Sequence, residues 1–401
     1  MNERLLHTPE GVRDVYDIEC QRRKKLTGTL KSVMEKYSYH DIETPTFEYF
    51  DIFNRDKGSA KANEMYKFFD RENNTLVLRP DMTPQIARCV AKYYKDVDLP
   101  IRLSYEGRVY KNIHNLQGKL TETTEVGGEL INDDSSAADA EILATVIDCF
   151  LAAGLTEFQI EVGNVNFFKG ITLEAGIDKD VEEKLRNYIH NKNAFGLSEY
   201  VKSLDLSEKL TETFDRFYNL FGGIDMLDDA LKLVDNPVSV EAIERLKRVY
   251  NALKVYGYEK HISFDLGLLS RYEYYTGIIF RGYTYGTGDA IVKGGRYNDL
   301  IGQFGKEAPA IGFCLVIDEL MSALSRQDIE IDVDYYDILM LYKRELQEKA
   351  IKEAVKLRRD GECVELIRMS ERKTLDDYKA YAKEAHFDKL IFYGEEGRVE
   401  L

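Results

Sequence analysis

The first clear pattern of hydrophobic and polar positions along the chain is helical. Between residues 18 and 37 the apolar side chains recur at helical spacing, and Lys, Arg and Glu fill the intervals. These apolar positions are Leu26, Leu30, Val33, Met34 and Tyr37. The pattern predicts an amphipathic helix with one buried face.

The next segment, residues 38–50, changes to a short alternating pattern. Ile42 and Thr44 alternate with charged residues, and Pro45 has no N–H group to donate to a neighbouring strand. We therefore expect a strand at the edge of a sheet or at an interface.

Seven short β-rich runs follow, and tight turns separate several of them. Such turns are too short for parallel crossovers, so the pattern predicts an α+β domain with a mostly antiparallel sheet flanked by helices. The runs cover residues 75–80, 101–111, 122–131, 158–163, 261–267, 274–283 and 310–318. Residues 178–258 instead show long helical patterns, which indicate a helical insertion within a core of residues 1–325.

Beyond Asp332 the chain begins a new alternation of strand, helix, strand, helix and strand with short loops. This order is typical of a small α/β unit with mostly parallel strands. We expect a second domain over residues 333–401.

The charge balance narrows the range of partners. The 401 residues carry 55 Lys and Arg against 71 Asp and Glu, a net charge of −16, which disfavours delocalised binding to nucleic acid. The five cysteines show no disulfide or zinc spacing, and no apolar run of about 18 residues could span a membrane. The N-terminal residues also lack a secretory signal. We expect a soluble, cytoplasmic protein that binds neither nucleic acid nor membranes.

Motifs for common catalytic and cofactor chemistry are not found in the sequence. It contains no phosphate-binding P-loop, zinc-protease helix, Cys/His ligand cluster or serine nucleophile elbow, so we expect no cofactor and no metal. The acidic pair in LINDDSSAADAEIL has the look of a ribose-binding motif, but no phosphate loop follows it. Asp134 or Ser135 is instead expected to cap a helix over residues 137–150.

Five segments in order resemble the catalytic core of class II histidyl-tRNA synthetases. They are TPEGVRDV (8–15), IETPTFEYFDIF (42–53), LRPDMTPQIAR (78–88), the pair within residues 99–131 that ends in ETTEVGGELI, and the run over residues 266–320 with YYTG, GGRYNDLIGQFG and PAIGF. Residues 333–401 resemble a shortened anticodon-binding domain of that family. The resemblance implies a six-stranded antiparallel sheet flanked by helices and a dimer formed around Pro45.

The positions of three arginines that the family uses to hold ATP are altered. They are occupied here by Lys111, Ser270 and Glu319, with Arg271 next to Ser270, and Thr123 replaces the aromatic residue that stacks on adenine. Guanidinium groups stabilise the charge that develops on the triphosphate, and Glu319 places an anion there instead. The resemblance therefore implies no ATP chemistry and no catalytic residues.

The amino-acid pocket of the family is better retained. The matching residues are Asp81 and Thr83 for the α-amino group, Glu125 where the family has Gln, Glu129 facing the imidazole, and Tyr274 and Tyr275 along the ring. A carboxylate and a phenol together can bond both imidazole nitrogens. Purely structural roles stay open: Glu129 pairing with a basic neighbour, Tyr275 in the core, and residues 294–296 forming a hairpin turn.

A synthetase-like chain without ATP chemistry resembles the regulatory subunits of ATP phosphoribosyltransferase, the first enzyme of histidine biosynthesis. That resemblance implies a non-catalytic subunit that binds and activates the short catalytic subunit and mediates inhibition by histidine. The alternative, an active histidyl-tRNA synthetase, needs the three arginines and a domain that reads an anticodon. Residues 334–401 carry 14 Lys and Arg against 16 Asp and Glu, a net charge of −2 without a basic stripe. A different paralogue of the same fold is a third hypothesis.

Overall fold

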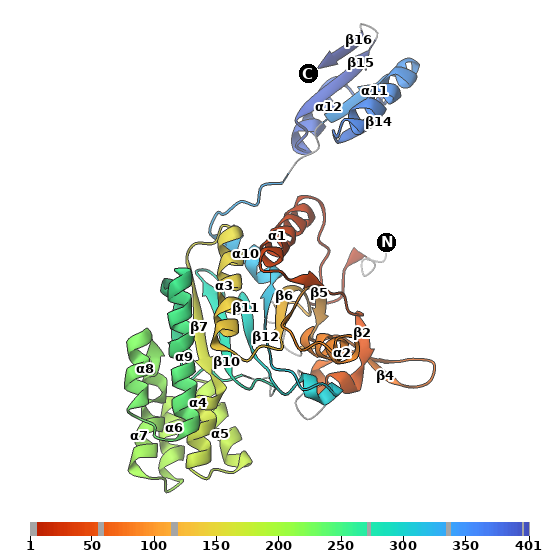
Figure 1. Ribbon diagram of the computed structural model, residues 1–401. Helices are drawn as coiled ribbons and strands as arrows, with labels where there is room; N and C mark the ends of the chain where they lie inside the picture. Colours follow the sequence, from red (N-terminus) through yellow and green to blue (C-terminus); the bar gives the residue numbers. More distant parts are fainter. Residues whose placement is uncertain are drawn as a thin grey trace. The chain divides into compact units, whose positions relative to one another are not determined.

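The computed structural model describes residues 6–54, 60–113, 119–270, 274–333, 338–394 and 397–400. The chain divides into two compact units, Met1–Ile331 and Asp332–Leu401. Figure 1 shows their elements along the sequence, and each unit is described by itself. Arg271, which neighbours one of the altered arginine positions, lies outside the described residues.

The first unit combines a large sheet with helices. Its α-helices are α1 (Asp17–Lys36), α2 (Thr83–Tyr93), α3 (Ser136–Ala152), α4 (Val165–Glu174), α5 (Lys179–His190), α6 (Ala194–Lys202), α7 (Glu208–Arg216), α8 (Ile224–Leu231), α9 (Pro237–Tyr256) and α10 (Ile317–Arg326). Its strands are β1 (His40–Asp41), β2 (Phe47–Tyr49), β3 (Lys67–Phe69), β4 (Thr75–Leu78), β5 (Ile101–Tyr110), β6 (Glu122–Ile131), β7 (Phe158–Asn164), β8 (Phe221–Gly222), β9 (Ile262–Asp265), β10 (Ile278–Thr284), β11 (Val292–Arg296) and β12 (Ala310–Val316).

The main sheet of the described residues has nine strands in the order β1-β5-β6-β12-β11-β10-β7-β9-β8. The six strands from β5 to β7 pair antiparallel throughout, which confirms the expected α+β class and its antiparallel body. The parallel strands β1 and β9 flank this body, and β8 pairs with β9. The run at residues 75–80 was predicted for the same sheet, but its strand β4 lies in a separate three-stranded sheet, β2-β4-β3.

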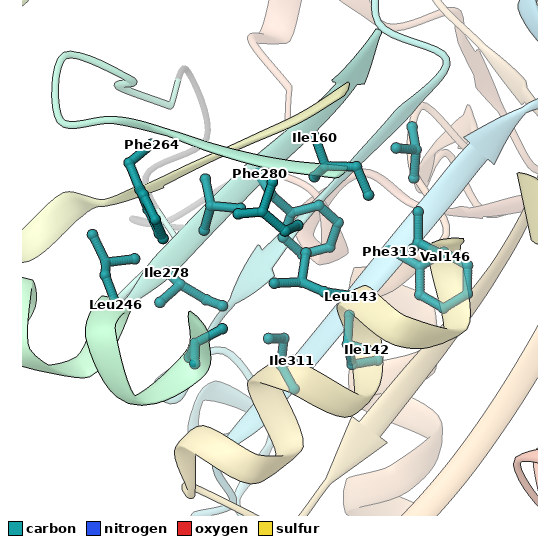
Figure 2. Packing of buried hydrophobic residues seen from close by; sticks show 14 of the residues in the cluster. Ile142, Leu143, Val146, Ile160, Leu246, Phe264, Ile278, Phe280, Ile311 and Phe313 are labelled. Atoms are coloured by element: carbon teal, nitrogen blue, oxygen red, sulfur yellow. The ribbon is translucent and has the colours of Figure 1, made fainter. Parts of the chain in front are cut away.

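One face of the main sheet carries the large hydrophobic core. Helix α3 packs against α1, α9 and β12. Figure 2 shows Ile142 and Leu143 of α3 close to Ile311 and Phe313 of β12, all of them buried. The helix begins where the sequence predicted, because the Ser135 side chain accepts a hydrogen bond from the backbone N–H of Ala138 and so caps it.

The other face of the sheet carries a smaller core under α2 and a 3₁₀ helix at Ile301–Phe304. Strand alternation places Ile311 and Phe313 of β12 on the large-core face, and Gly312 and Cys314 on this second face. This second face holds most of the residues that the sequence analysis selected.

The helical segment after α4 adds its own apolar packing to the large core. Phe214 and Phe217 are fully buried there, with ring centroids 6.3 Å apart. Helix α9 packs on both α3 and α4, and it ends at Gly257, whose positive φ of 79° suits a glycine cap.

The second unit contains β13 (Ile338–Tyr342), α11 (Gln347–Arg359), β14 (Val364–Arg368), α12 (Leu375–Glu384), β15 (Lys389–Gly394) and β16 (Gly397–Glu400). Its sheet has the order β14-β13-β15-β16, with β13 parallel to both of its neighbours. Thr374 and Asp377 form a capping box that starts α12. Strand β16 was not predicted from the sequence; it pairs antiparallel with β15 and carries little hydrophobic pattern of its own.

Candidate functional site

The candidate site lies on the second face of the main sheet, and strand register assembles it. Glu125, Gly127 and Glu129 alternate along β6 toward this face. Glu129 is paired with Gly312 of β12, and Gly312 with Gly295 of β11. In the next row Gly127 is paired with Cys314, and Cys314 with Lys293. Small residues therefore occupy much of the floor, and the charged side chains Glu125, Glu129 and Lys293 rise from it.

Steric contacts explain why glycine occupies two positions of the floor. A Cβ atom at Gly312 would collide with the carboxylate of Glu129, and one at Gly295 would lie 2.8 Å from the ring of Tyr275. The Glu129 carboxylate therefore lies directly over the backbone of Gly312, and the Tyr275 ring lies directly over the backbone of Gly295. Gly295 belongs to the interior of β11, so the alternative that residues 294–296 form a hairpin turn is wrong.

Glu129 is the most enclosed acidic group of the site, with 1% of its surface exposed. The Thr83 hydroxyl donates to its Oε1 over 2.9 Å, and the Tyr297 phenol donates to its Oε2 over 2.5 Å. Burial raises the pKa of Glu129 to about 8, and the two hydroxyl donors partly oppose that shift. Its neighbours are hydroxyl groups, so pairing with a basic residue, one of the structural alternatives, is not what the structure shows.

Sequence reasoning missed Tyr297. This residue directly follows the Gly-Gly-Arg of β11, and its ring packs edge-on against Tyr274, 6.0 Å between centroids. The available signal in the sequence was a tyrosine directly after Gly-Gly-Arg. Tyrosine hydroxyls in cores need a polar partner.

Two further carboxylates lie on this face. Asp81 precedes α2 and accepts hydrogen bonds from the Thr83 backbone N–H, 3.1 Å, and from the Tyr274 phenol, 3.3 Å. Burial raises the pKa of Asp81, and it raises the pKa of Glu125 to about 7 with a further contribution from the Asp81 charge. The nearby Lys111 ammonium lowers both pKa values. The six residues predicted for an amino-acid pocket thus share one face of the sheet.

The three residues at the altered ATP positions lie in different surroundings. Lys111 is half-buried beside the pocket carboxylates, and its backbone N–H donates to Thr121 over 2.8 Å. Ser270 is half-buried at the end of a described stretch. Glu319 lies in the first turn of α10, where it forms no ion pair with the residues that the structure describes.

Asp318, next to Glu319, has a clear structural role. Its carboxylate forms an ion pair with Arg23 of α1 and accepts a hydrogen bond from the Thr124 backbone N–H over 3.0 Å. Arg13 approaches the same carboxylate to 3.9 Å. The acid also lies at the N-terminus of α10, where the helix dipole favours negative charge. Arg23 and the Thr124 N–H group therefore stabilise the charge of Asp318, and these contacts link α1 to β6.

A separate pocket of about 390 Å³ lies between the start of α9 and the ends of β10 and β11. Two of its lining residues, Arg245 and Arg296, donate to the fully buried carboxylate of Asp139, over 2.7 and 2.8 Å. Asp134, of the acidic pair in the sequence, forms ion pairs with the same two arginines. The polar groups of this pocket are largely bound to one another, and the acidic pair serves this network.

The described part of the chain offers no membrane-spanning helix and no metal-ligand cluster. No helix there is long and apolar enough to cross a membrane, and no group of three or more His, Cys, Asp or Glu residues could hold a metal ion. The five cysteines are free thiols.

The chain resembles known proteins in both sequence and fold. Residues 11–320 match the sequence profile of the Histidyl-tRNA synthetase family. The crystal structure of an ATP phosphoribosyltransferase regulatory subunit/histidyl-tRNA synthetase from Bacillus halodurans C is similar with a TM-score of 0.86 and 31% identity, covering 97% of this chain and 98% of that one. Histidyl-tRNA synthetase from Nostoc sp. PCC 7120, 20% identical, shares the fold with a TM-score of 0.80, covering 98% of this chain and 96% of that one. The fold is that of the histidyl-tRNA synthetases.

Relatives that are similar in sequence identify the family more narrowly than the fold does. The ATP phosphoribosyltransferase regulatory subunit of Acetivibrio thermocellus is 39% identical over 381 residues, 95% of this chain and 91% of the relative. That of Ruminiclostridium cellulolyticum is 35% identical over 401 residues, 100% of this chain and 95% of the relative. The chain belongs to the family of ATP phosphoribosyltransferase regulatory subunits. This membership confirms the predicted regulatory subunit over the alternative of an active synthetase.

Proposed function

We propose that the chain binds the short catalytic subunit of ATP phosphoribosyltransferase in the cytoplasm, activates it, and makes it sensitive to histidine. One observation supports this most: the side chains that the family resemblance assigns to amino-acid binding are assembled on one face, whereas Lys111, Ser270 and Glu319 stand at the positions that the resemblance assigns to ATP-binding arginines. A chain of this kind is suited to recognise an amino acid without activating it. The free thiols fit a reducing compartment.

The proposed effector site is the group of polar side chains over β6, β11 and β12. Asp81 and Glu125 form the acidic end that suits the α-ammonium group of histidine. Glu129 and Tyr275 form the end for the imidazole, whose two nitrogens need separate hydrogen-bond partners. Thr83 contributes indirectly, because its hydroxyl orients Glu129 in addition to its expected role near the ammonium group.

We further propose that the chain forms a dimer through the three-stranded sheet that follows Pro45. This sheet exposes Phe47, 53% accessible, and Phe69, 69% accessible, beside Tyr49 and Phe68. Contiguous exposed aromatic side chains on a folded protein are typical of a surface that a partner covers. A second copy is the partner that the family resemblance implies.

Reconstitution with the short catalytic subunit tests the proposal. We expect a larger complex by sedimentation, raised phosphoribosyltransferase activity, and inhibition by histidine that the catalytic subunit alone lacks. Regulation requires histidine to bind two states of the complex with different affinity. Unchanged sedimentation and activity on mixing would contradict the proposed partnership.

The effector site has its own test within that complex. Glu129→Ala and Tyr275→Ala should each weaken histidine inhibition by about one to two decades, since an imidazole N–H would lose its buried partner. Inhibition that is unchanged in both variants would place the effector elsewhere, while the partnership itself would stand.

A further inference from the structure

Lys293 is a charged side chain on the floor of the candidate pocket, and neither the sequence analysis nor the family resemblance gave it a role. It lies in the middle of β11, paired with Cys314 of β12 on one side and Arg281 of β10 on the other. Its neighbour Val292 belongs to the large core, so strand alternation directs Lys293 to the opposite face, with Glu125 and Glu129.

The ring of Tyr105 lies against Gly127 on the floor between Lys293 and the acidic residues, and its hydroxyl donates to the backbone oxygen of Phe313 over 3.4 Å. The row from β11 to β6 runs through Cys314 to Gly127, so a thiol and a glycine separate Lys293 from β6. Adjacent strands are about 4.8 Å apart, which places β11 roughly 10 Å from β6. A free amino acid lying between two long side chains bridges a gap of that size.

Lys293 is half-buried, and its ammonium group forms no ion pair or hydrogen bond with the residues that the structure describes. Asp289, whose charge also acts on Lys293, is paired with Lys119 over 2.8 Å. Burial and the charge of Lys111 lower the pKa of Lys293, whereas the charge of Glu125 raises it. A half-buried cation in this position is stabilised by an anionic ligand.

We propose that Lys293 binds the α-carboxylate of the amino-acid effector. The pocket then matches a zwitterion, with Asp81 and Glu125 at the ammonium group and the Lys293 ammonium, on the β11 side, at the carboxylate. Ser270 stands where the synthetase fold has an arginine, and Lys293 supplies a positive charge from a different strand. This inference rests on the proposed function, because it assumes that histidine enters this pocket.

The test compares ligands as well as variants. Calorimetric titration of the full chain with L-histidine is compared with titration by L-histidinol, in which a hydroxymethyl group replaces the carboxylate. Lys293→Met should weaken histidine binding by about tenfold to a hundredfold and change histidinol binding less than threefold. Lys293→Arg should retain most of the affinity for histidine. Lys232→Met, at the exposed residue that follows α8, is the matched control and should bind both ligands as the unmodified chain does.

The outcomes separate this inference from the proposed function. If Glu129→Ala weakens histidine binding but Lys293→Met leaves it unchanged, the effector site stands and the role of Lys293 is overturned. If Lys293→Met weakens both ligands equally, Lys293 supports the pocket structure and does not bind the carboxylate. If histidine binds neither the chain nor its complex with the catalytic subunit, the proposed effector site fails, and this inference fails with it.

Discussion

The phenol of Tyr297 donates a hydrogen bond to the carboxylate of Glu129 over 2.5 Å, although 168 residues separate the two in the sequence. Both side chains are almost completely buried. The bond links the segment after β11 to β6, and it fixes the orientation of the acid proposed to face the imidazole.

Removing that donor should destabilise the chain. Tyr297→Phe leaves the buried Glu129 carboxylate with Thr83 as its remaining hydroxyl donor, at a cost of about 1–3 kcal/mol in the free energy of unfolding. Urea denaturation measures the change. Tyr93→Phe, at an exposed position of α2, serves as the control and should stay within about 0.5 kcal/mol of the unmodified chain. Equal stabilities of the two variants would show that the buried bond contributes little.

The raised pKa of Glu129 predicts a specific dependence of stability on pH. Its ordinary value is 4.5 and its folded value about 8, so between these values the folded state binds more protons than the unfolded state. The free energy of unfolding therefore falls as pH rises through this window. Glu129→Gln removes this contribution, so its stability relative to the unmodified chain should rise from pH 5 to pH 8. A constant difference across that range would contradict the shifted pKa. Comparing the two proteins at each pH cancels the contributions of the other titrating groups to the free energy of unfolding.

The glycine beneath Glu129 should tolerate no side chain. Gly312→Ala places a methyl group where the Glu129 carboxylate lies, and the strained packing should cost about 1–3 kcal/mol in unfolding free energy. Gly288→Ala is the matched control, because a Cβ atom there meets open space. Thermal denaturation of both variants gives the comparison, and an unaffected Gly312→Ala variant would mean that Glu129 moves aside at little cost.

Self-association should depend on the exposed aromatic residues of the three-stranded sheet. Phe69→Asp introduces a charge that would have to be desolvated in an interface, so we expect the dimer to dissociate. Sedimentation equilibrium at several concentrations detects this. Phe195→Asp, which also alters an exposed phenylalanine but on α6, should leave the association unchanged. A dimer that persists in the Phe69→Asp variant would place the interface on another surface.

The altered ATP positions predict no amino-acid activation. The purified chain should show no histidine-dependent exchange of pyrophosphate into ATP, and restoring one arginine, as in Lys111→Arg, should not create it. Residues that act as a unit in catalysis have strongly non-additive effects, so a single restored cation does not rebuild the site. Robust exchange by the unmodified chain would overturn the non-catalytic interpretation.

Local features of the sequence determined several elements directly. The helical spacing of Leu26, Leu30 and Val33 predicted α1, which spans Asp17–Lys36, and a cap at Asp134 or Ser135 predicted the start of α3, which Ser135 caps. Interactions within a few residues fix such features, so a single stretch of sequence contains the information. The match to synthetase motifs likewise selected residues from the sequence that the structure brings to one face of the sheet, and their role in binding stays a prediction.

The tertiary structure alone decided how those residues meet. The positions of Lys293 and Gly312 beside Glu125 and Glu129 follow from the register of β11 and β12 against β6, and no local pattern encodes that register. The hydroxyl partners of Glu129 likewise come from α2 and from the segment after β11. Burial among those partners sets the pKa of Glu129, because the desolvation of an acid depends on everything that surrounds it and not on its neighbours in the sequence.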